Sequence, residues 1–197
     1  MKKRAFRVIG VSSLLLIFML LGTLTASAQD SAQETKRFGF GFGFNLYRGM
    51  DSRFSGNGNL FLLTFKLSED FDISLLREEI KMNGSGVPAT GGRVEVDVDC
   101  NITGIRIMRR ISNFLHIGID IGNASYSNGI EDSSLMAGFL ATITTIESRD
   151  KLFHSKLDID LGYRILNTNN ANVFNNPNNL VTNLDGFSIG MNFKVLF

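Results

Sequence analysis

The sequence predicts an all-β protein, an eight-stranded antiparallel up-and-down transmembrane β-barrel preceded by a cleaved signal peptide. Three observations carry this prediction. Large apolar residues alternate with small or polar ones along most of the chain, which is the period of two that a strand requires. The segments that connect these stretches are short and long in turn, as in outer-membrane barrels. The N-terminus has the basic, apolar and small-residue regions of a secretory signal.

Residues 1–28 are predicted to be the signal peptide. A basic start is followed by an apolar run from Val8 to Leu24, and Ala26-Ser27-Ala28 has the small-x-small pattern of a cleavage site. A permanent N-terminal membrane helix is the alternative, but serines and glycines interrupt the run and the cleavage site follows it closely. We expect a short periplasmic leader at 29–36 and the outer-membrane β-barrel domain at 37–197.

Charge and cysteine content exclude several classes of protein. The predicted signal holds four of the 20 Lys and Arg and none of the 19 Asp and Glu, so the mature chain has a net charge of −3. Nothing therefore indicates nucleic acid as a partner. Cys100 is the only cysteine and cannot form an internal disulfide, so we expect it in a buried apolar role. The sequence has no Cys/His cluster that indicates zinc, and we predict no metal and no other cofactor.

The first predicted strand begins directly after the leader. Its large residues are Phe38, Phe40, Phe42, Phe44 and Leu46, and they alternate with Gly39, Gly41, Gly43 and Asn45. A helix would spread the phenylalanines around its circumference, whereas a strand places them all on one face. Glycine on the opposite face leaves room inside a tightly curved sheet. We expect the phenylalanine face to contact lipid.

The same alternation predicts six more strands before the last one. Their apolar faces are predicted to hold Phe61, Leu63, Phe65 and Leu67; Phe71, Ile73 and Leu75; Val94, Val96, Val98, Cys100, Ile105 and Ile107; Leu115, Ile117, Ile119 and Ile121; Leu135, Ala137, Phe139, Ala141 and Ile143; and Phe153, Leu157, Ile159, Leu161, Tyr163 and Ile165. The phase slips near Gly104, which predicts a β-bulge there. Short turns are predicted at 68–70, 109–113 and 147–151, and longer polar loops near 47–59, 77–93, 123–134 and 166–185. Tyr47 and Tyr163 are predicted at the membrane interface nearer the loops.

The last eleven residues predict the eighth strand. Its apolar positions are Phe187, Ile189, Met191, Phe193, Val195 and Phe197. This stretch resembles the C-terminal signal of bacterial outer-membrane β-barrels, in which an aromatic final residue after alternating apolar positions is read by the barrel assembly machinery. The resemblance implies that these six residues are an assembly signal and that this machinery is a partner. The mature chain as a whole is similar in architecture to the small eight-stranded barrels of the OmpA/OmpX type.

The face opposite the apolar one predicts a polar interior. Its charged and histidine residues are Lys66, Asp72, Arg106, His116, Asp120, His154, Lys156, Asp158, Asp160, Arg164 and Lys194. Eight strands enclose a space that side chains can fill, and unpaired charges there would be costly, so we expect a sealed interior with paired networks. An ion path or a proton-linked site is the alternative interpretation. A porin-type aqueous channel would need many more strands.

We therefore expect a non-enzymatic integral protein of the cell outer membrane, with a structural or cell-surface interaction role through its extracellular loops. The expected partners are outer-membrane lipid and lipopolysaccharide, and a surface ligand or host partner at the loops. We predict no catalytic residues, because the adjacent His154 and Ser155 would point to opposite faces of a strand. Three alternatives stay open: an outer-leaflet enzyme that modifies lipid A, a narrow channel, and, if the chain is soluble, a lipocalin-like periplasmic ligand carrier.

Overall fold

The computed structural model describes residues 37–50, 54–86, 94–127, 132–149, 153–166 and 184–197. These residues belong to one compact unit, Thr35–Phe197. The predicted signal peptide (1–28) and leader (29–36) lie outside the described residues, as does most of the predicted loop at 166–185. Within the described ranges, no helix is long and apolar enough to cross a membrane.

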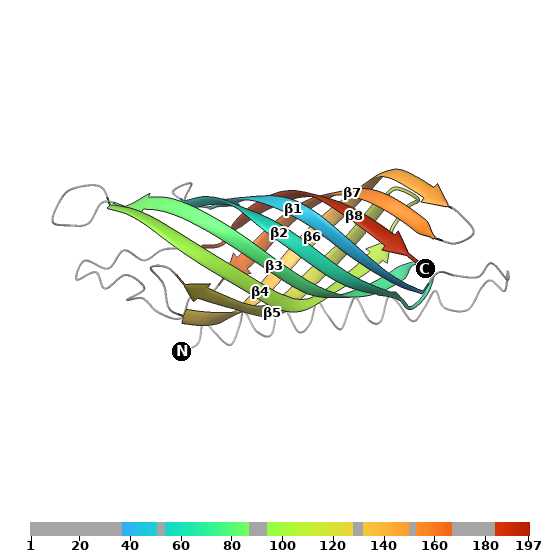
Figure 1. The fold of residues 1–197 in the computed structure, drawn as a ribbon, viewed down its shortest axis with the longest axis horizontal. Helices are drawn as coiled ribbons and strands as arrows, with labels where there is room; N and C mark the ends of the chain where they lie inside the picture. Colours follow the sequence, from blue (N-terminus) through green and yellow to red (C-terminus); the bar gives the residue numbers. More distant parts are fainter. Residues whose placement is uncertain (1–36, 51–53, 87–93, 128–131, 150–152, 167–183) are drawn as a thin grey trace. The chain divides into compact units, whose positions relative to one another are not determined.

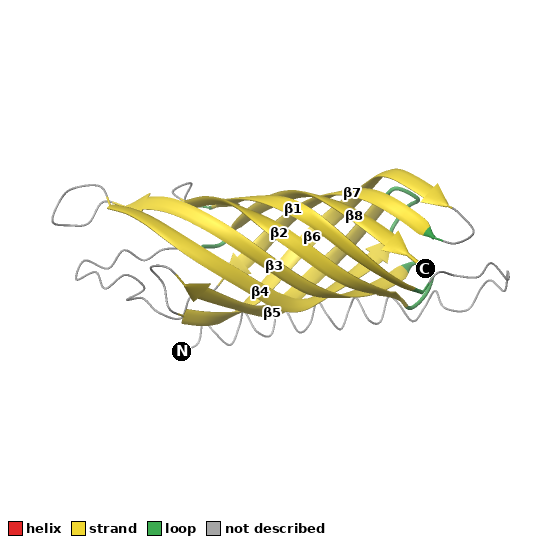
Figure 2. Ribbon diagram, in the orientation of Figure 1, coloured by secondary structure: helices red, strands yellow, loops and turns green. Residues whose placement is uncertain are grey.

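Eight strands form a closed antiparallel barrel in which each strand pairs with the next along the chain and the last pairs with the first (Figures 1 and 2). This confirms the predicted all-β fold. The strands are β1 (Phe38–Gly49), β2 (Phe54–Lys66), β3 (Phe71–Gly86), β4 (Val94–Arg110), β5 (Leu115–Ser127), β6 (Asp132–Arg149), β7 (His154–Leu166) and β8 (Gly186–Leu196). We call the side with the β2–β3, β4–β5 and β6–β7 connections the turn end, and the opposite side the loop end.

The strand register fixes the tilt of the barrel wall. Following paired residues once around the barrel from Phe38 leads back to Arg48 on the same strand, ten residues further along. With a rise of ~3.3 Å per residue and strands ~4.8 Å apart, this displacement requires a tilt of about 40° from the barrel axis. At that tilt, the outward residues of β1 from Phe38 to Leu46 span about 20 Å along the axis, close to the apolar height of outer-membrane barrels.

The outer wall near the turn end is apolar. On β1 the phenylalanines Phe38, Phe40, Phe42 and Phe44 are all exposed, and the glycines between them face inward. Phe40 and Phe42 contact Phe197 and Phe193 at the β1–β8 seam, with ring centroids 5.9 and 5.6 Å apart. In water this wall would be unfavourable, whereas lipid is a suitable solvent for it. The predicted outward alternation is present on β1, β2, β3, β6, β7 and β8, whereas on β5 Ile119, predicted on the outer face, is buried.

The strands extend further toward the loop end than the sequence pattern predicts, and there the pattern inverts. On β3, Leu76, Ile80 and Met82 are buried inside the barrel, while Arg77 and Lys81 are exposed on its outer wall. Outward apolar residues give way to outward polar ones between Leu46 and Arg48, Phe61 and Asn59, Leu75 and Arg77, Ile105 and Thr103, and Ile121 and Asn123. Beyond this boundary, β1 to β5 have apolar residues facing inward and polar residues facing outward, as in a water-soluble protein. The predicted loops at 47–59, 77–93 and 123–134 are accordingly shorter than expected.

The predicted β-bulge at Gly104 is wrong. The pairing of β4 with both β3 and β5 runs through Gly104 without a shift. The phase of the sequence changes because Val98 and Cys100 point into the barrel beyond the boundary, whereas Ile105 and Ile107 point outward below it. The register instead shifts between Thr144 and Ile146 on β6. This strand continues to Arg149, so it includes part of the turn predicted at 147–151.

A compact apolar core fills the barrel at the loop end. We call it the loop-side core; it comprises Tyr47, Phe54, Leu60, Leu62, Leu76, Ile80, Met82, Val98, Cys100, Ile102, Ala124, Tyr126, Met136, Leu166 and Leu184. Tyr47 is therefore not at the membrane interface as predicted. It points inward, and its hydroxyl donates a hydrogen bond to the Leu184 carbonyl. Cys100 is buried, as expected, but inside this core rather than on the outer wall.

Candidate functional site: the barrel interior and a groove on the outer wall

Arg106 is the centre of the polar interior. It points inward from β4 and is 2% exposed. Its Nε and Nη2 donate to the two carboxylate oxygens of Asp120 at 2.8 and 3.0 Å, and its Nη1 donates to Asp160 Oδ2 at 2.7 Å. Asp160 also accepts hydrogen bonds from Thr142 Oγ1, at 2.6 Å, and from the Asn192 amide. One guanidinium thus joins β4, β5 and β7, and the added bonds offset the cost of burying these charges.

A second ion pair lies between this centre and the loop-side core. Arg164 Nη2 is 2.6 Å from Glu78 Oε2 and 3.6 Å from Asp120 Oδ2. Glu78 is completely buried, and its Oε1 accepts a hydrogen bond from the Asn45 amide at 2.7 Å. Asp120 therefore links the two arginines. The chain of contacts from Asn45 through Glu78, Arg164, Asp120 and Arg106 crosses the barrel from β1 to β4.

Glycines make room for this network. Gly190 on β8 pairs with Asn45, and a Cβ at Gly190 would overlap the Asn45 amide oxygen. Gly43 pairs with Asn192, and a Cβ there would overlap the Asn192 amide oxygen. The glycines predicted to leave space inside the sheet therefore accommodate two named amide side chains, which hold Glu78 and Asp160.

The turn end of the interior holds the remaining charged residues. Lys194 Nζ lies 2.9 Å from Asp158 Oδ2, and Thr144 donates to Asp158 Oδ1 at 2.8 Å. Glu147 on β6 lies 3.4 Å from Lys156 Nζ and 2.6 Å from His154 Nε2.

The structure therefore joins some of the predicted interior residues and not others. It joins Arg106, Asp120, Asp160 and Arg164 in one group and Asp158 with Lys194 in another. Lys156 and His154 meet Glu147 instead. Lys66 and Asp72 are cross-strand neighbours on β2 and β3, and His116 is half-buried on the inner face of β5. Among the described residues, no hydrogen bond or ion pair at these distances includes these last three side chains.

Glu78 is the interior residue that the sequence interpretation missed. The prediction ended the strand at Leu76 and assigned 77–93 to a loop. The signal was available, because Leu76, Glu78, Ile80 and Met82 alternate with Arg77, Glu79 and Lys81. In that stretch, however, the more polar residues face outward, so the pattern does not look like that of a lipid-facing strand.

The interior leaves little room for solvent or ligand. A cavity of about 10 Å³ lies beside Arg106, Asp120, Asp160 and Arg164, which is about the space that one water molecule needs. The described residues hold no group of three or more His, Cys, Asp or Glu side chains that could bind a metal ion. Ser74 hydrogen-bonds with Thr64, and Ser134 with Tyr126, so these inward hydroxyls are part of the packing.

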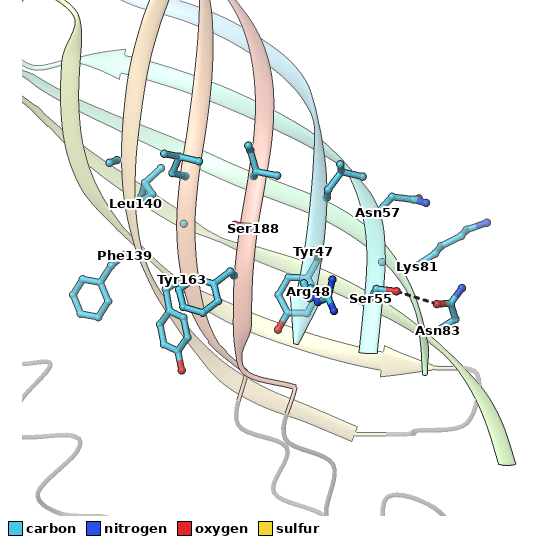
Figure 3. A pocket seen from close by; sticks show the side chains of 17 residues that line it. Tyr47, Arg48, Ser55, Asn57, Lys81, Asn83, Phe139, Leu140, Tyr163 and Ser188 are labelled. Carbon is cyan, nitrogen blue, oxygen red and sulfur yellow. Dashed lines mark hydrogen bonds between the residues drawn. The ribbon is translucent and has the colours of Figure 1, made fainter. Parts of the chain in front are cut away.

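A second candidate site is a groove on the outer wall toward the loop end (Figure 3). It crosses six neighbouring strands, from β6 through β7, β8, β1 and β2 to β3. Its apolar part lies over β6, β7 and β8 and includes Phe139, Leu161, Tyr163, Phe187 and Ile189. Its polar part lies over β1, β2 and β3 and includes Arg48, Ser55, Asn57, Lys81 and Asn83.

The residues of the predicted assembly signal lie on β8 and at its end. Phe187, Ile189, Met191, Phe193 and Phe197 are exposed on the outer wall, and Val195 is half-buried on the same face. Their recognition by an assembly machinery stays a prediction. These residues form the outward apolar face of β8, and β8 closes the barrel by pairing with β1.

The fold is similar to that of solved membrane barrels. The crystal structure of Neisserial surface protein A shares 12% identity, with 81% of this chain and 96% of that chain covered and a TM-score of 0.51. The Yersinia pestis outer membrane protein Ail in a phospholipid bilayer nanodisc gives 9% identity, coverages of 80% and 99%, and a TM-score of 0.47. Outer membrane protein AlkL in lipid bilayers gives 10% identity, coverages of 86% and 94%, and a TM-score of 0.44.

At these identities the likeness is one of fold. No protein-family model matches the sequence, and no curated protein matches it. The chain has the eight-stranded antiparallel fold of small bacterial outer-membrane barrels.

Proposed function

We propose that the chain is a non-enzymatic integral protein of the bacterial outer membrane, a sealed barrel whose role is structural or lies in contacts made at the cell surface. The apolar outer wall supports the membrane location, because an exposed belt of phenylalanine, leucine and isoleucine is stable only against lipid. The fold similarity described above supports the outer membrane in particular.

The single observation that carries the sealed-barrel proposal is the filling of the interior in its middle and at the loop end. The ion pairs of Arg106 and Arg164 occupy the middle, and the loop-side core closes the interior beyond them. A conducting path needs connected space, and the cavity beside Arg106 holds about one water molecule. Charges held at 2.6–2.8 Å in such a packed interior are fixed rather than available to a passing ion.

Conductance tests this proposal. The full chain is inserted into planar lipid bilayers and the current is recorded at low and high salt. We expect no discrete steps beyond those of bilayers without protein. Reproducible steps that change when Asp120 is replaced by Asn would overturn the sealed barrel in favour of a narrow channel. A variant at the exposed Glu79, Glu79→Gln, carries the same chemical change on the outer wall and is the matched control.

The non-enzymatic part of the proposal has a separate test. Among the described inward serines, Ser74 bonds to Thr64, Ser134 bonds to Tyr126, and Ser188 lines the small cavity beside Arg106. Within the described residues no hydrogen bond joins any of the three to a histidine, which supports the absence of a nucleophile–base pair. Mass spectrometry of lipid A from cells with and without the protein should give the same acyl pattern. A change in acyl chains that depends on the protein would show that it is an enzyme.

A further inference from the structure

The outer-wall groove has an apolar part and a polar, cationic part side by side, which suit the acyl chains and the headgroup of a lipid (Figure 3). Over β6 to β8 it is lined by exposed apolar side chains, with the rings of Tyr163 and Phe187 5.1 Å apart. Over β1 to β3 it is lined by cations and neutral polar groups. We propose that this groove binds a phosphorylated glycolipid with several acyl chains, of the lipid A type, with its chains over β6–β8 and a phosphate at Arg48 and Lys81. This rests on the proposed location in the outer membrane.

The position of the groove along the barrel axis suits a headgroup. Arg48 follows Leu46 directly on the outer face of β1, at the point where outward residues change from apolar to polar. On β3 the same change occurs between Leu75 and Arg77, and Lys81 lies beyond it. Arg48 is therefore at the level of lipid headgroups, and Lys81 lies further toward the loop end. Phe187 is the register partner of Arg48, and Ile189 is the partner of Leu46 on the apolar side of the change.

Charge complementarity favours an anion between β1 and β3. Arg48 pairs in register with Ser55 on β2 and with Phe187 on β8, so neither strand places an acidic residue opposite it. Lys81 pairs with Asn57 on β2, although Asp99 lies opposite it on β4. Arg48 is thus the stronger anchor. The two cations lie on either side of β2, two strand spacings and two residues apart, which puts their backbones about 12 Å from each other. Ser55 and Asn57 lie between them as hydrogen-bonding groups.

A second carboxylate near the two cations, Glu79, is already partnered. Glu79 Oε1 lies 2.8 Å from Arg77 Nη2 on the same outer face of β3, which offsets its repulsion of a phosphate. Within the described residues, neither Arg48 nor Lys81 forms an ion pair at such distances. A phosphate can accept two hydrogen bonds from the planar guanidinium of Arg48 and gives Lys81 a charge partner.

The width of the groove favours a lipid with more than two chains. Its lining residues come from six adjacent strands, and five strand spacings correspond to about 24 Å of wall. Ala141 lies between the larger outward residues Phe139 and Ile143 and lowers the surface there. Several acyl chains can lie side by side over this stretch while one phosphate reaches Arg48. This separates the proposed ligand from a single phospholipid.

Native mass spectrometry of the full chain, folded in detergent micelles, tests the proposal. The probes are hexa-acylated diphosphoryl lipid A, its dephosphorylated form, and phosphatidylglycerol. We expect the protein to retain one molecule of the diphosphoryl form, and Arg48→Gln with Lys81→Gln to reduce the retained fraction about tenfold, which corresponds to the loss of roughly 1.4 kcal/mol of charge-assisted bonding. Arg37→Gln removes an exposed cation just before β1 at the turn end and should leave retention unchanged.

The arms of the experiment separate the possible failures. Equal retention by the wild type and the double variant would overturn the cation site, and equal retention of phosphatidylglycerol would overturn the choice of a multi-chain glycolipid. Loss of retention in Arg37→Gln as well would show general charge attraction and also contradict the site. Each variant is first shown to be folded by its mobility on an unheated detergent gel. A failed lipid site with intact heat-dependent mobility leaves the membrane barrel standing.

Discussion

Arg106 and Asp120 face each other across the β4–β5 ladder and form a two-bond ion pair, with Nε to Oδ1 at 2.8 Å and Nη2 to Oδ2 at 3.0 Å. Both side chains are buried inside the barrel. The fork geometry leaves Nη1 for Asp160 on β7, so the pair also spans the barrel lumen. This relationship explains why so many ionisable residues can be enclosed in a narrow membrane barrel. In this central group each charge has an opposite charge as a partner, and Asp120 is shared by two arginines.

Removing Arg106 should destabilise the barrel strongly. In Arg106→Met the side-chain length is kept, but Asp120 loses its two-bond partner and Asp160 loses one donor. We expect a loss of about 3–5 kcal/mol in the free energy of unfolding, as is typical when one member of a buried ion pair is removed. Urea unfolding of the protein in lipid vesicles measures this. Arg77→Met, at an exposed ion pair, should cost less than about 1 kcal/mol. Equal effects of the two substitutions would contradict the interior network.

Gly190→Ala should disturb Glu78, although the two residues are not in contact. The added Cβ would overlap the Asn45 amide and move it from Glu78, leaving the buried carboxylate without that donor. We expect a loss of about 1–3 kcal/mol, measured by the same urea titration. At Gly138 the nearest atoms to an added Cβ are 3.3 to 3.5 Å away, so Gly138→Ala should be tolerated much better. If Gly138→Ala proved the more harmful, the assignment of space to Asn45 would be incorrect.

The hydroxyl of Tyr47 should contribute to stability, whereas that of Tyr163 should not. Tyr47→Phe removes the hydrogen bond to the Leu184 carbonyl inside the loop-side core, and we expect this to cost about 1–3 kcal/mol. Tyr163 lies on the outer wall, and Tyr163→Phe keeps its ring contact with Phe187, so a change within about 0.5 kcal/mol is expected. Thermal unfolding in vesicles distinguishes the two variants. A neutral Tyr47→Phe would show that this tyrosine is not an inward anchor.

A charge on the outer wall should be costly only below the polarity boundary. Phe42 is 56% exposed in the middle of the apolar belt, so Phe42→Arg should lose about 2–4 kcal/mol when the barrel is folded in a bilayer. Ser125, exposed on β5 beyond the boundary, is in a polar region, and Ser125→Arg should lose about 0–1 kcal/mol. Folding titrations in vesicles of one lipid composition measure both. If both substitutions were neutral, Phe42 would be facing water and the belt would not be a membrane surface.

The barrel could be predicted from the sequence because a membrane-spanning strand must alternate strictly between apolar and polar or small residues. Between the turn end and the boundary, lipid on one side and polar interior on the other force strict alternation, and this stretch of β1, β7 and β8 has the faces that were predicted. Strand number and order follow, because each alternating stretch is separate and consecutive strands pair.

The same alternation misleads where the surroundings change. Val98 and Cys100 have the apolar period of a lipid-facing strand, yet they point inward because the outer face there is polar. A period of two identifies the two faces of a strand but not which face contacts water. For this reason Tyr47 was predicted at the membrane interface, and Glu78 was assigned to a loop. The partners of the interior charges could not be predicted, since Arg106 and Asp160 lie 54 residues apart and meet only after closure. The groove at Arg48 was not predicted either, because it depends on the tilt of six strands.

Gel mobility of the membrane-extracted protein tests the central claim, a closed barrel that spans the outer membrane, most directly. A closed ladder has no strand edge from which unfolding can begin, so the folded form resists detergent until it is heated. We predict that the protein is recovered in the outer-membrane fraction and that its mobility changes on boiling. Recovery in the soluble periplasmic fraction with no heat-dependent change would contradict the membrane barrel and favour a lipocalin-like carrier.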